Sequence, residues 1–197
     1  MMQSKSFQVN FGVVTIAILF AVFSRLLPHP PNFAPMLAIG IFGGALFMKK
    51  IWAWAVPVIA IWLSDLFLNN VIFADYFDSF VWLYDGWYWQ YVVYFLVPAV
   101  SGFLFKRNIS IGKIAGVSIG AALLFFLISN FGVWASTAMY PKTTEGLYTC
   151  YIMGLPFLKG TLLSNLCYST VLFGGYYIFE TKTSFIPLVD KYRWRWI

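Results

Sequence analysis

Apolar runs with few or no charged residues, most of them about 20 residues long, recur along the chain and limit what it can fold into. They lie at about 7–27, 33–48, 51–68, 87–105, 114–136 and 160–179. A helix needs about 20 apolar residues to cross a bilayer, whereas a strand of a membrane barrel alternates over about 10. Charged residues make up only 10% of the chain, against roughly 25% in soluble domains. The pattern predicts an all-α polytopic membrane protein, a single domain over residues 1–197 with six transmembrane helices.

The basic residues indicate which side of the membrane each loop occupies. With the N-terminus inside, the inner segments hold ten Lys and Arg residues and the outer segments hold three. The inner ones are Lys5, Lys49, Lys50, Lys106, Arg107, Lys113, Lys182, Lys191, Arg193 and Arg195, and the outer ones are Arg25, Lys142 and Lys159. Cytoplasmic loops are enriched in Lys and Arg, so we expect both termini to be cytoplasmic. These loops account for the net charge of +6, and we expect no nucleic-acid partner.

One apolar stretch between the last two predicted spans is too short to cross a bilayer. Residues 146–157 read G-L-Y-T-C-Y-I-M-G-L-P-F, a length more typical of re-entrant or interfacial pieces. A seventh span at this point would also place the basic C-terminal tail outside. We therefore expect an outer re-entrant or interfacial segment at about 140–158.

The loop between the first two spans is rich in proline. Residues 24–35 read S-R-L-L-P-H-P-P-N-F-A-P and include His29, the only histidine of the chain. Proline fixes the φ angle and removes a backbone donor, so this segment cannot be helical. We expect a stiff, extended cap between two membrane helices.

The strongly polar residues gather toward the outer ends of the predicted spans. Asp65 and Asn69 lie one turn apart on the third span, and Asn130 and Trp134 lie four residues apart on the fifth. A polar side chain within the membrane costs up to a few kcal/mol unless it faces a cavity or a partner. We therefore expect a cup in the bundle that opens outward and is roofed by the proline-rich loop and by residues 140–157.

These residues form the candidate substrate site. The candidates are Arg25, Asn32, Asp65, Asn69, Asn130, Trp134, Tyr140, Cys150, Tyr151 and Asn165. In this interpretation the aromatic rings stack on a flat organic ligand, the amides orient it, and Arg25 with Asp65 sets the charge preference. The alternative is structural: Arg25 and Asp65 form an ion pair, and the asparagines donate interhelical hydrogen bonds.

Small residues on the first span are open to two interpretations. Ala17 and Ala21 lie on one helix face and allow another helix to approach closely. The face either packs within the bundle or forms a docking surface for a partner membrane protein. The same spacing recurs at Gly40 with Gly44 and at Gly116 with Gly120.

The chain carries one motif of an enzyme, which we reject. Gly116-Val-Ser118-Ile-Gly120 matches the G-x-S-x-G motif of serine hydrolases. A serine nucleophile needs a base within hydrogen-bond reach, but His29 lies in an outer loop and Ser118 lies near the inner end of its span. We therefore expect no enzyme activity and no cofactor. We also expect no metal site, because a lone histidine is a weak signal for metal binding. Cys150 is either a small buried hydrophobe or a soft-metal ligand.

Three strings carry a resemblance that spans nearly the whole chain. They are R-L-L-P-H-P-P-N-F-A-P (25–35), S-N-F-G-V-W (129–134) and Y-P-x-T-x-x-G-L-Y-x-C-Y-x-x-x-L-P-F (140–157). They resemble an uncharacterised bacterial family of membrane proteins described as transport proteins. That family is similar in size and topology to the substrate-binding S components of energy-coupling-factor (ECF) vitamin transporters.

The resemblance implies a fold and a set of partners. S components have six helices, structured outer loops that cap a vitamin pocket, and an Ala-x-x-x-Ala surface on the first helix for a coupling subunit. Ala17 and Ala21 fit that surface. The resemblance also implies the bacterial inner membrane and a coupling transmembrane subunit with ATPases, but it does not identify the solute. If the pocket took a cobalamin-like cofactor, Cys150 would be the cobalt ligand.

Two functions follow from these observations. The first is a membrane substrate-binding or transport protein that takes up a small vitamin-like solute from the outer face. The second is a non-catalytic structural or accessory subunit of a larger membrane complex. A ligand-sized cavity behind the proline-rich loop favours the first, whereas a filled core with a wide apolar groove outside favours the second.

Overall fold

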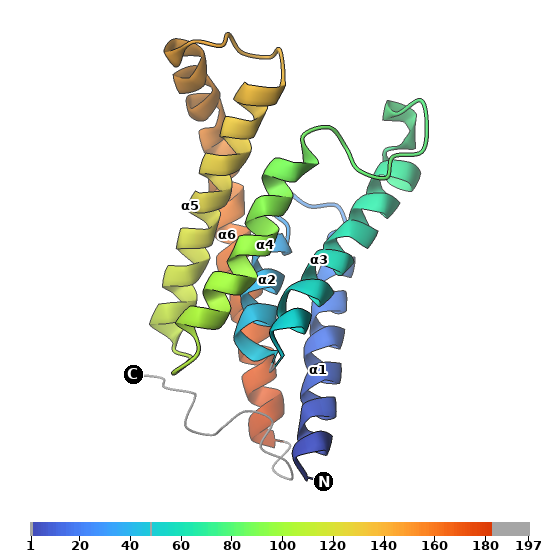
Figure 1. Cartoon of the computed structure of the whole chain (residues 1–197), viewed down its shortest axis with the longest axis vertical. Coiled ribbons are helices and arrows are strands. Elements are labelled where there is room, and N and C mark those ends of the chain that lie inside the picture. Colours follow the sequence, from blue (N-terminus) through green and yellow to red (C-terminus); the bar gives the residue numbers. More distant parts are fainter. Residues whose placement is uncertain (1, 48, 183–197) are drawn as a thin grey trace.

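The chain folds into a bundle of helices (Figure 1). The structure, a computed structural model, describes residues 2–47 and 49–182, and within the first helix it describes side chains from Phe11 onward. The helices are α1 (Met2–Ser24), α2 (Met36–Leu46), α3 (Lys50–Phe67), η1 (Leu68–Ile72), η2 (Ala74–Tyr76), α4 (Trp87–Leu104), α5 (Ile111–Ser136) and α6 (Thr144–Lys182). No strand occurs in the described ranges. The all-α prediction is therefore confirmed for this part of the chain.

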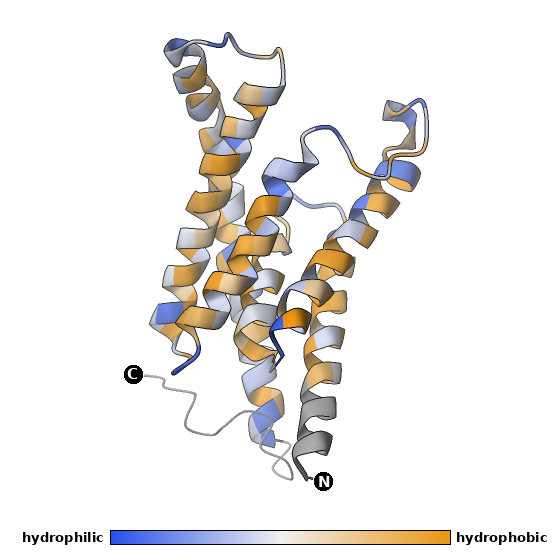
Figure 2. Ribbon diagram, viewed as in Figure 1, coloured by the Kyte–Doolittle hydropathy of each residue, from blue (hydrophilic) through white to orange (hydrophobic). Residues whose placement is uncertain are grey.

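Among the described residues, two helices are long and apolar enough to cross a membrane. They are Lys50–Ile72, which joins α3 to the π-helical η1, and α5. Phe11–Ser24 of α1 and the whole of α2 are apolar but shorter. Figure 2 shows apolar residues along the outward surfaces of the long helices. The start of α1 and the end of α6 lie at the same end of the bundle (Figure 1).

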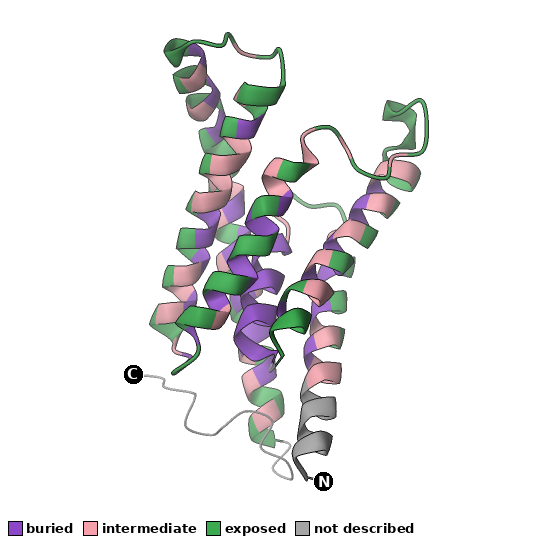
Figure 3. Ribbon diagram, in the orientation of Figure 1, coloured by how far each residue is buried: buried purple, intermediate pink, exposed green. Residues whose placement is uncertain are grey.

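Helix α2 forms the centre of the bundle. All 11 of its residues are buried (Figure 3), as expected for a helix that is apolar on every side. Its glycines let neighbouring helices approach: a Cβ on Gly43 would lie 2.8 Å from the ring of Pro57 in α3, and one on Gly44 would collide with the backbone of Pro98 in α4. At 1.5 Å per residue, α2 spans about half of a bilayer core. The longer helices around it therefore extend past its first residue.

The segment at 140–158 leads directly into the last helix. From Thr144 it is continuous with α6, one helix of 39 residues with Pro156 inside it. The re-entrant or interfacial placement of this segment in the membrane stays a prediction. At 1.5 Å per residue the helix is about 58 Å long, nearly twice the bilayer core. Two glycines explain its close packing: Gly154 faces the side chain of Asn130 in α5, and Gly160 faces the carbonyl of Pro31 in the proline-rich loop.

The small-residue face of α1 lies inside the bundle. Ala21 is 4% exposed, and Ala17 is partly buried against the core. Close packing between helices therefore accounts for Ala17 and Ala21 in the described residues, and the docking surface for a partner stays a prediction. Of the basic residues used to orient the chain, Lys191, Arg193 and Arg195 lie outside the described residues, as does the side chain of Lys5.

Candidate functional site

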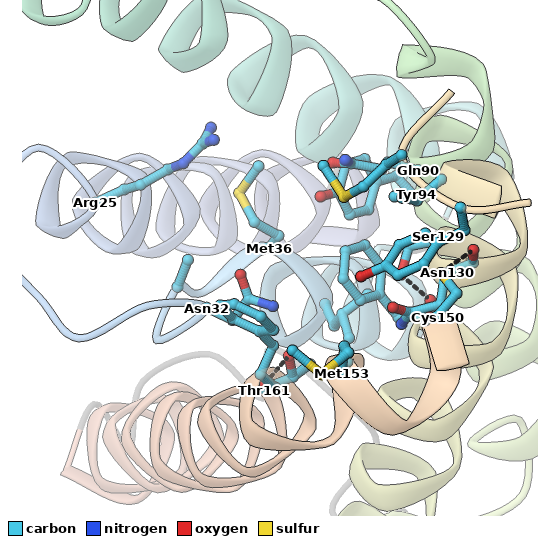
Figure 4. A pocket seen from close by; sticks show the side chains of 18 residues that line it. Arg25, Asn32, Met36, Gln90, Tyr94, Ser129, Asn130, Cys150, Met153 and Thr161 are labelled. Atoms are coloured by element: carbon cyan, nitrogen blue, oxygen red, sulfur yellow. Dashed lines mark hydrogen bonds between the residues drawn. The ribbon is translucent and has the colours of Figure 1, made fainter. Parts of the chain in front are cut away.

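A cavity of about 470 Å³ lies where α2 begins. Helices α4, α5 and α6 surround it, together with residues of the proline-rich loop and of the α5–α6 connection (Figure 4). Its lining comprises Arg25, Asn32, Ala34, Met36, Leu37, Gln90, Tyr94, Phe125, Ser129, Asn130, Val133, Met139, Tyr140, Cys150, Met153, Gly154, Phe157 and Thr161. Five of the candidate residues therefore meet in one cavity: Arg25, Asn32, Asn130, Tyr140 and Cys150.

The short length of α2 creates this cavity. Pro35 precedes its first residue, and Met36 and Leu37 line the cavity floor. Because the surrounding helices continue past Met36, the space beyond it is left between them. The volume is within the range of roughly 300–1,000 Å³ that small-molecule sites occupy.

The proline-rich loop is a wall of the cavity and not its roof. Figure 1 shows it well below the α5–α6 connection. The backbone carbonyl of Asn32 accepts a hydrogen bond of 3.3 Å from Ser164 Oγ in α6. Asn32 has a φ of +57°, a left-handed conformation that asparagine adopts more readily than most residues. This bend points the chain from the loop into α2.

Arg25 and Asp65 form an ion pair beside the cavity. Arg25 Nη1 donates to Asp65 Oδ1 at 2.5 Å and to Ser64 Oγ at 2.7 Å. The hydroxyl of Tyr91 donates to Asp65 Oδ2 at 2.8 Å. Both oxygens of Asp65 are thus bonded, and the residue is 5% exposed. Asp65 does not line the cavity, so it matches the structural alternative, an ion pair with Arg25. Arg25 also lines the cavity.

Asn130 and Cys150 meet at the opposite end of the cavity (Figure 4). The Cys150 thiol donates to the backbone carbonyl of Asn130 at 3.3 Å, and Asn130 Nδ2 donates to Phe126 O at 2.8 Å. Asn130 Oδ1 packs against Gly154. Cys150 is 2% exposed and lies between α5 and α6, where the hydrogen bond to the Asn130 carbonyl holds its side chain.

Four other candidates do not line the cavity: Asn69, Trp134, Tyr151 and Asn165. Trp134 Nε1 donates to Pro141 O at 2.9 Å, and its ring lies 5.6 Å from Lys142 Nζ, so this side chain fastens the α5–α6 connection. The Tyr151 hydroxyl donates to Leu127 O at 2.9 Å. Asn69 lines a separate hollow of about 220 Å³ at the far end of α3.

Asn165 lies deeper, between α5 and α6. Its Nδ2 donates to Ser118 O at 2.6 Å, and Ser118 Oγ donates to Ser169 Oγ at 2.9 Å. All three residues are buried, and Asn165 Oδ1 has no hydrogen-bond partner among the described residues. Ser118 has no histidine partner there, and its hydroxyl serves helix packing. Polar groups therefore also extend below the cavity, between α5 and α6.

Several residues of the cavity lining are not among the candidate site residues predicted from the sequence. They are Gln90 and Tyr94 of α4, Phe125 and Ser129 of α5, and Met36, Met139 and Met153. Gln90 accepts a hydrogen bond of 2.7 Å from the Tyr84 hydroxyl, whose pKa is raised by burial. A repeat of four residues places Gln90 with Tyr94, and Phe125 with Ser129, on single helix faces. This four-residue spacing was the sequence signal that could have identified these lining residues.

Comparisons with known proteins add a family but no activity. The chain matches the model of a family of unknown function, DUF6580, over residues 5–187. Neither the curated proteins nor the solved structures include a match. Within the described residues, no three His, Cys, Asp or Glu side chains gather as a metal site would require.

Proposed function

We propose that this chain, which belongs to the DUF6580 family, is a substrate-binding membrane protein that takes up a small vitamin-like solute from the outer face of a bacterial inner membrane. In this proposal the six membrane segments are α1 to α6, of which α2 crosses only about half of the bilayer core, and both termini are cytoplasmic. The single observation that carries it is the cavity of about 470 Å³ at the start of α2. Polar and aromatic groups converge there within a bundle that is otherwise closely packed.

The direction of capture follows from where the cavity lies. Below it, α2 and the buried core close the path toward the end that holds the start of α1 and the end of α6. The solute therefore enters from the opposite end, past Met139 and Tyr140 in the α5–α6 connection. Asn32, Asn130 and Gln90 offer amides that orient it, and movement of the α5–α6 connection gates its entry.

The resemblance to ECF S components suggests how uptake would be powered. The chain has no phosphate-binding G-x-x-x-x-G-K-[ST] motif, so a coupling transmembrane subunit with ATPases would drive uptake. Because Ala21 is buried, that subunit would contact other residues of α1 or another helix.

Mass spectrometry of co-purifying small molecules tests this function. The full-length protein is extracted in a mild detergent, and its organic contents are compared with those of a variant whose cavity is filled, Ser129→Phe. Ser129 lines the cavity, so a phenyl ring at this position occupies the solute's place. We expect one organic compound near one per protein in the wild type and much less in the variant.

A matched substitution controls for the added ring. Leu123 lies on the same helix but is 43% exposed on the outer surface, so Leu123→Phe should retain the compound. Equal amounts of the compound in the wild type and in Ser129→Phe would place it outside the cavity and contradict the proposal.

One observation favours the accessory-subunit function instead. Gly112, Gly116 and Gly120 lie on one face of α5, and a Cβ on any of them would meet no atom within 4 Å. A second helix could approach this open face closely. If Gly116→Leu released a stoichiometric partner protein from the purified complex while the cavity of the wild type contained no solute, the accessory function would replace transport.

A further inference from the structure

The cavity has one charged side chain in its lining, and that side chain is cationic. Of the 18 lining residues, Arg25 alone carries a charge, and the others are neutral. The nearby carboxylate of Asp65 does not face the cavity, because Arg25 and Tyr91 bond its two oxygens and the residue is 5% exposed. The ion pair therefore presents its positive partner to the cavity and buries its negative one.

The guanidinium of Arg25 retains hydrogen-bonding capacity. Within the described residues its side chain donates two hydrogen bonds, both from Nη1, one to Ser64 and one to Asp65. A guanidinium carries five N–H donors in a planar fork that matches a carboxylate. Nη2 and Nε have no hydrogen-bond partner among the described residues, which leaves donors for a ligand.

The floor of the cavity adds positive potential at the same end. Helix α2 begins there, and no side chain caps its first N–H groups. The N-terminus of a helix carries a partial positive charge and attracts anions. Figure 4 shows Arg25 and Met36, the first residue of α2, toward one end of the cavity, and Asn130 and Cys150 toward the other.

The remaining lining suits an apolar body. Met36, Met139 and Met153 contribute thioethers, and Phe125, Tyr94 and Phe157 contribute rings. Methionine adapts its shape to a ligand and contacts aromatic rings favourably. The three sulfur atoms belong to different walls of the cavity.

From these features we propose that the cavity takes a small organic acid: its carboxylate lies between Arg25 and the N-terminus of α2, and its apolar or aromatic body lies among the methionines and rings. This inference rests on the proposed function, since it names the class of solute that the same cavity would bind.

Three probes of one shape and different charge test the inference. They are 3-phenylpropanoate, 3-phenylpropanamide and 3-phenylpropylamine, titrated at pH 7 onto the full-length protein in phosphatidylcholine nanodiscs, with Ser129→Phe as the background for partition into lipid. We expect the carboxylate to bind at least about tenfold more tightly than the amide, since charge-assisted bonds to arginine are the stronger ones. The amine should bind most weakly.

A double variant removes the cation without leaving a buried charge. In Arg25→Gln/Asp65→Asn both partners are neutral, and Tyr91 can still donate to the new amide. This variant should bind carboxylate and amide within about twofold of each other, whereas Asp65→Asn alone, which keeps Arg25, should retain the preference. Circular dichroism and gel filtration confirm that the variants are folded.

The outcomes separate the inference from the function on which it rests. Equal binding of the three probes, or tighter binding of the amine, overturns the organic-acid proposal but leaves a solute-binding cavity. A carboxylate preference that persists in the double variant also overturns it, because another group would then be responsible. If no probe binds above the Ser129→Phe background, both the inference and the proposed function fail.

Discussion

At the scale of single residues, the buried carboxylate of Asp65 ties three helices together. It joins Arg25, at the end of α1, to Tyr91 of α4 from its own position in α3. A buried carboxylate without a partner is costly because it loses its hydration. Arg25, which gives the cavity lining its charge, is therefore also needed to hold the buried carboxylate of Asp65.

The first prediction concerns this ion pair. Arg25→Ala leaves the Asp65 carboxylate buried without its cation, and breaking such a pair costs roughly 3–5 kcal/mol. The double variant Arg25→Ala/Asp65→Asn removes the charge as well and should lose much less stability. Thermal unfolding in detergent measures both. A single variant that unfolds at the same temperature as the double variant would show that Asp65 is hydrated and not held by Arg25.

The second prediction compares two glycines in contrasting surroundings. A Cβ on Gly154 would collide with the Asn130 side chain, whereas one on Gly116 would meet nothing within 4 Å. Gly154→Ala should therefore lower the unfolding temperature and weaken solute binding, because Asn130 must leave its place in the cavity wall. Gly116→Ala should be neutral or stabilising by about 0.5–1 kcal/mol, the helix preference of alanine over glycine. Equal effects of the two substitutions would contradict the assigned packing of α5 against α6.

At the scale of elements, the sequence predicted the bounds of α4 and α5 better than those of α6. The predicted span 87–105 corresponds to α4 and the span 114–136 to α5, because long uncharged runs have few other structures open to them. The predicted last span began at residue 160, whereas α6 begins at Thr144, because residues 146–157 were treated as a separate apolar piece too short to cross a bilayer. The first turns of α6 are held by contacts with α5, such as the hydrogen bond from Cys150 to the carbonyl of Asn130, which a single sequence does not reveal.

The candidate site shows the same limit. Depth along a helix could be predicted, and Asn32, Asn130 and Cys150 do line the cavity. The direction around the helix axis could not, because it depends on which neighbours pack against each face. Trp134, four residues from Asn130, therefore turned out to contact the α5–α6 connection.

The third prediction tests the continuity of α6. Pro156 lies within the helix, where it removes one backbone hydrogen bond, and it is exposed. Pro156→Ala should therefore raise the unfolding temperature. As a contrast, Pro98→Ala should lower it, because Pro98 is buried against Gly44 of α2. If Pro156→Ala destabilised the protein, the proline would mark a break between two segments, as a re-entrant loop requires.

At the scale of the whole molecule, the fold combines a short central helix with longer helices around it. The buried residues of α2 fill the half of the bundle nearer to the start of α1. The cavity lies beyond the first residues of α2, so it is placed toward one end of the bundle. This asymmetry has a functional meaning only if the cavity end faces the outside, as the proposed orientation requires.

The last prediction tests that orientation. In a background with Cys150→Ser and Cys167→Ser, single cysteines are placed at three exposed positions: Ser79 before α4, Thr143 before α6, and Lys106 between α4 and α5. A maleimide that does not cross membranes should label Ser79→Cys and Thr143→Cys in intact cells, and Lys106→Cys only after permeabilisation, because the two ends of the bundle then face opposite compartments. If only Lys106→Cys were labelled in intact cells, the protein would have the opposite orientation in the membrane, and the cavity would open to the cytoplasm. Uptake from outside would then be excluded, whereas labelling of all three without permeabilisation would argue against a membrane-spanning bundle altogether.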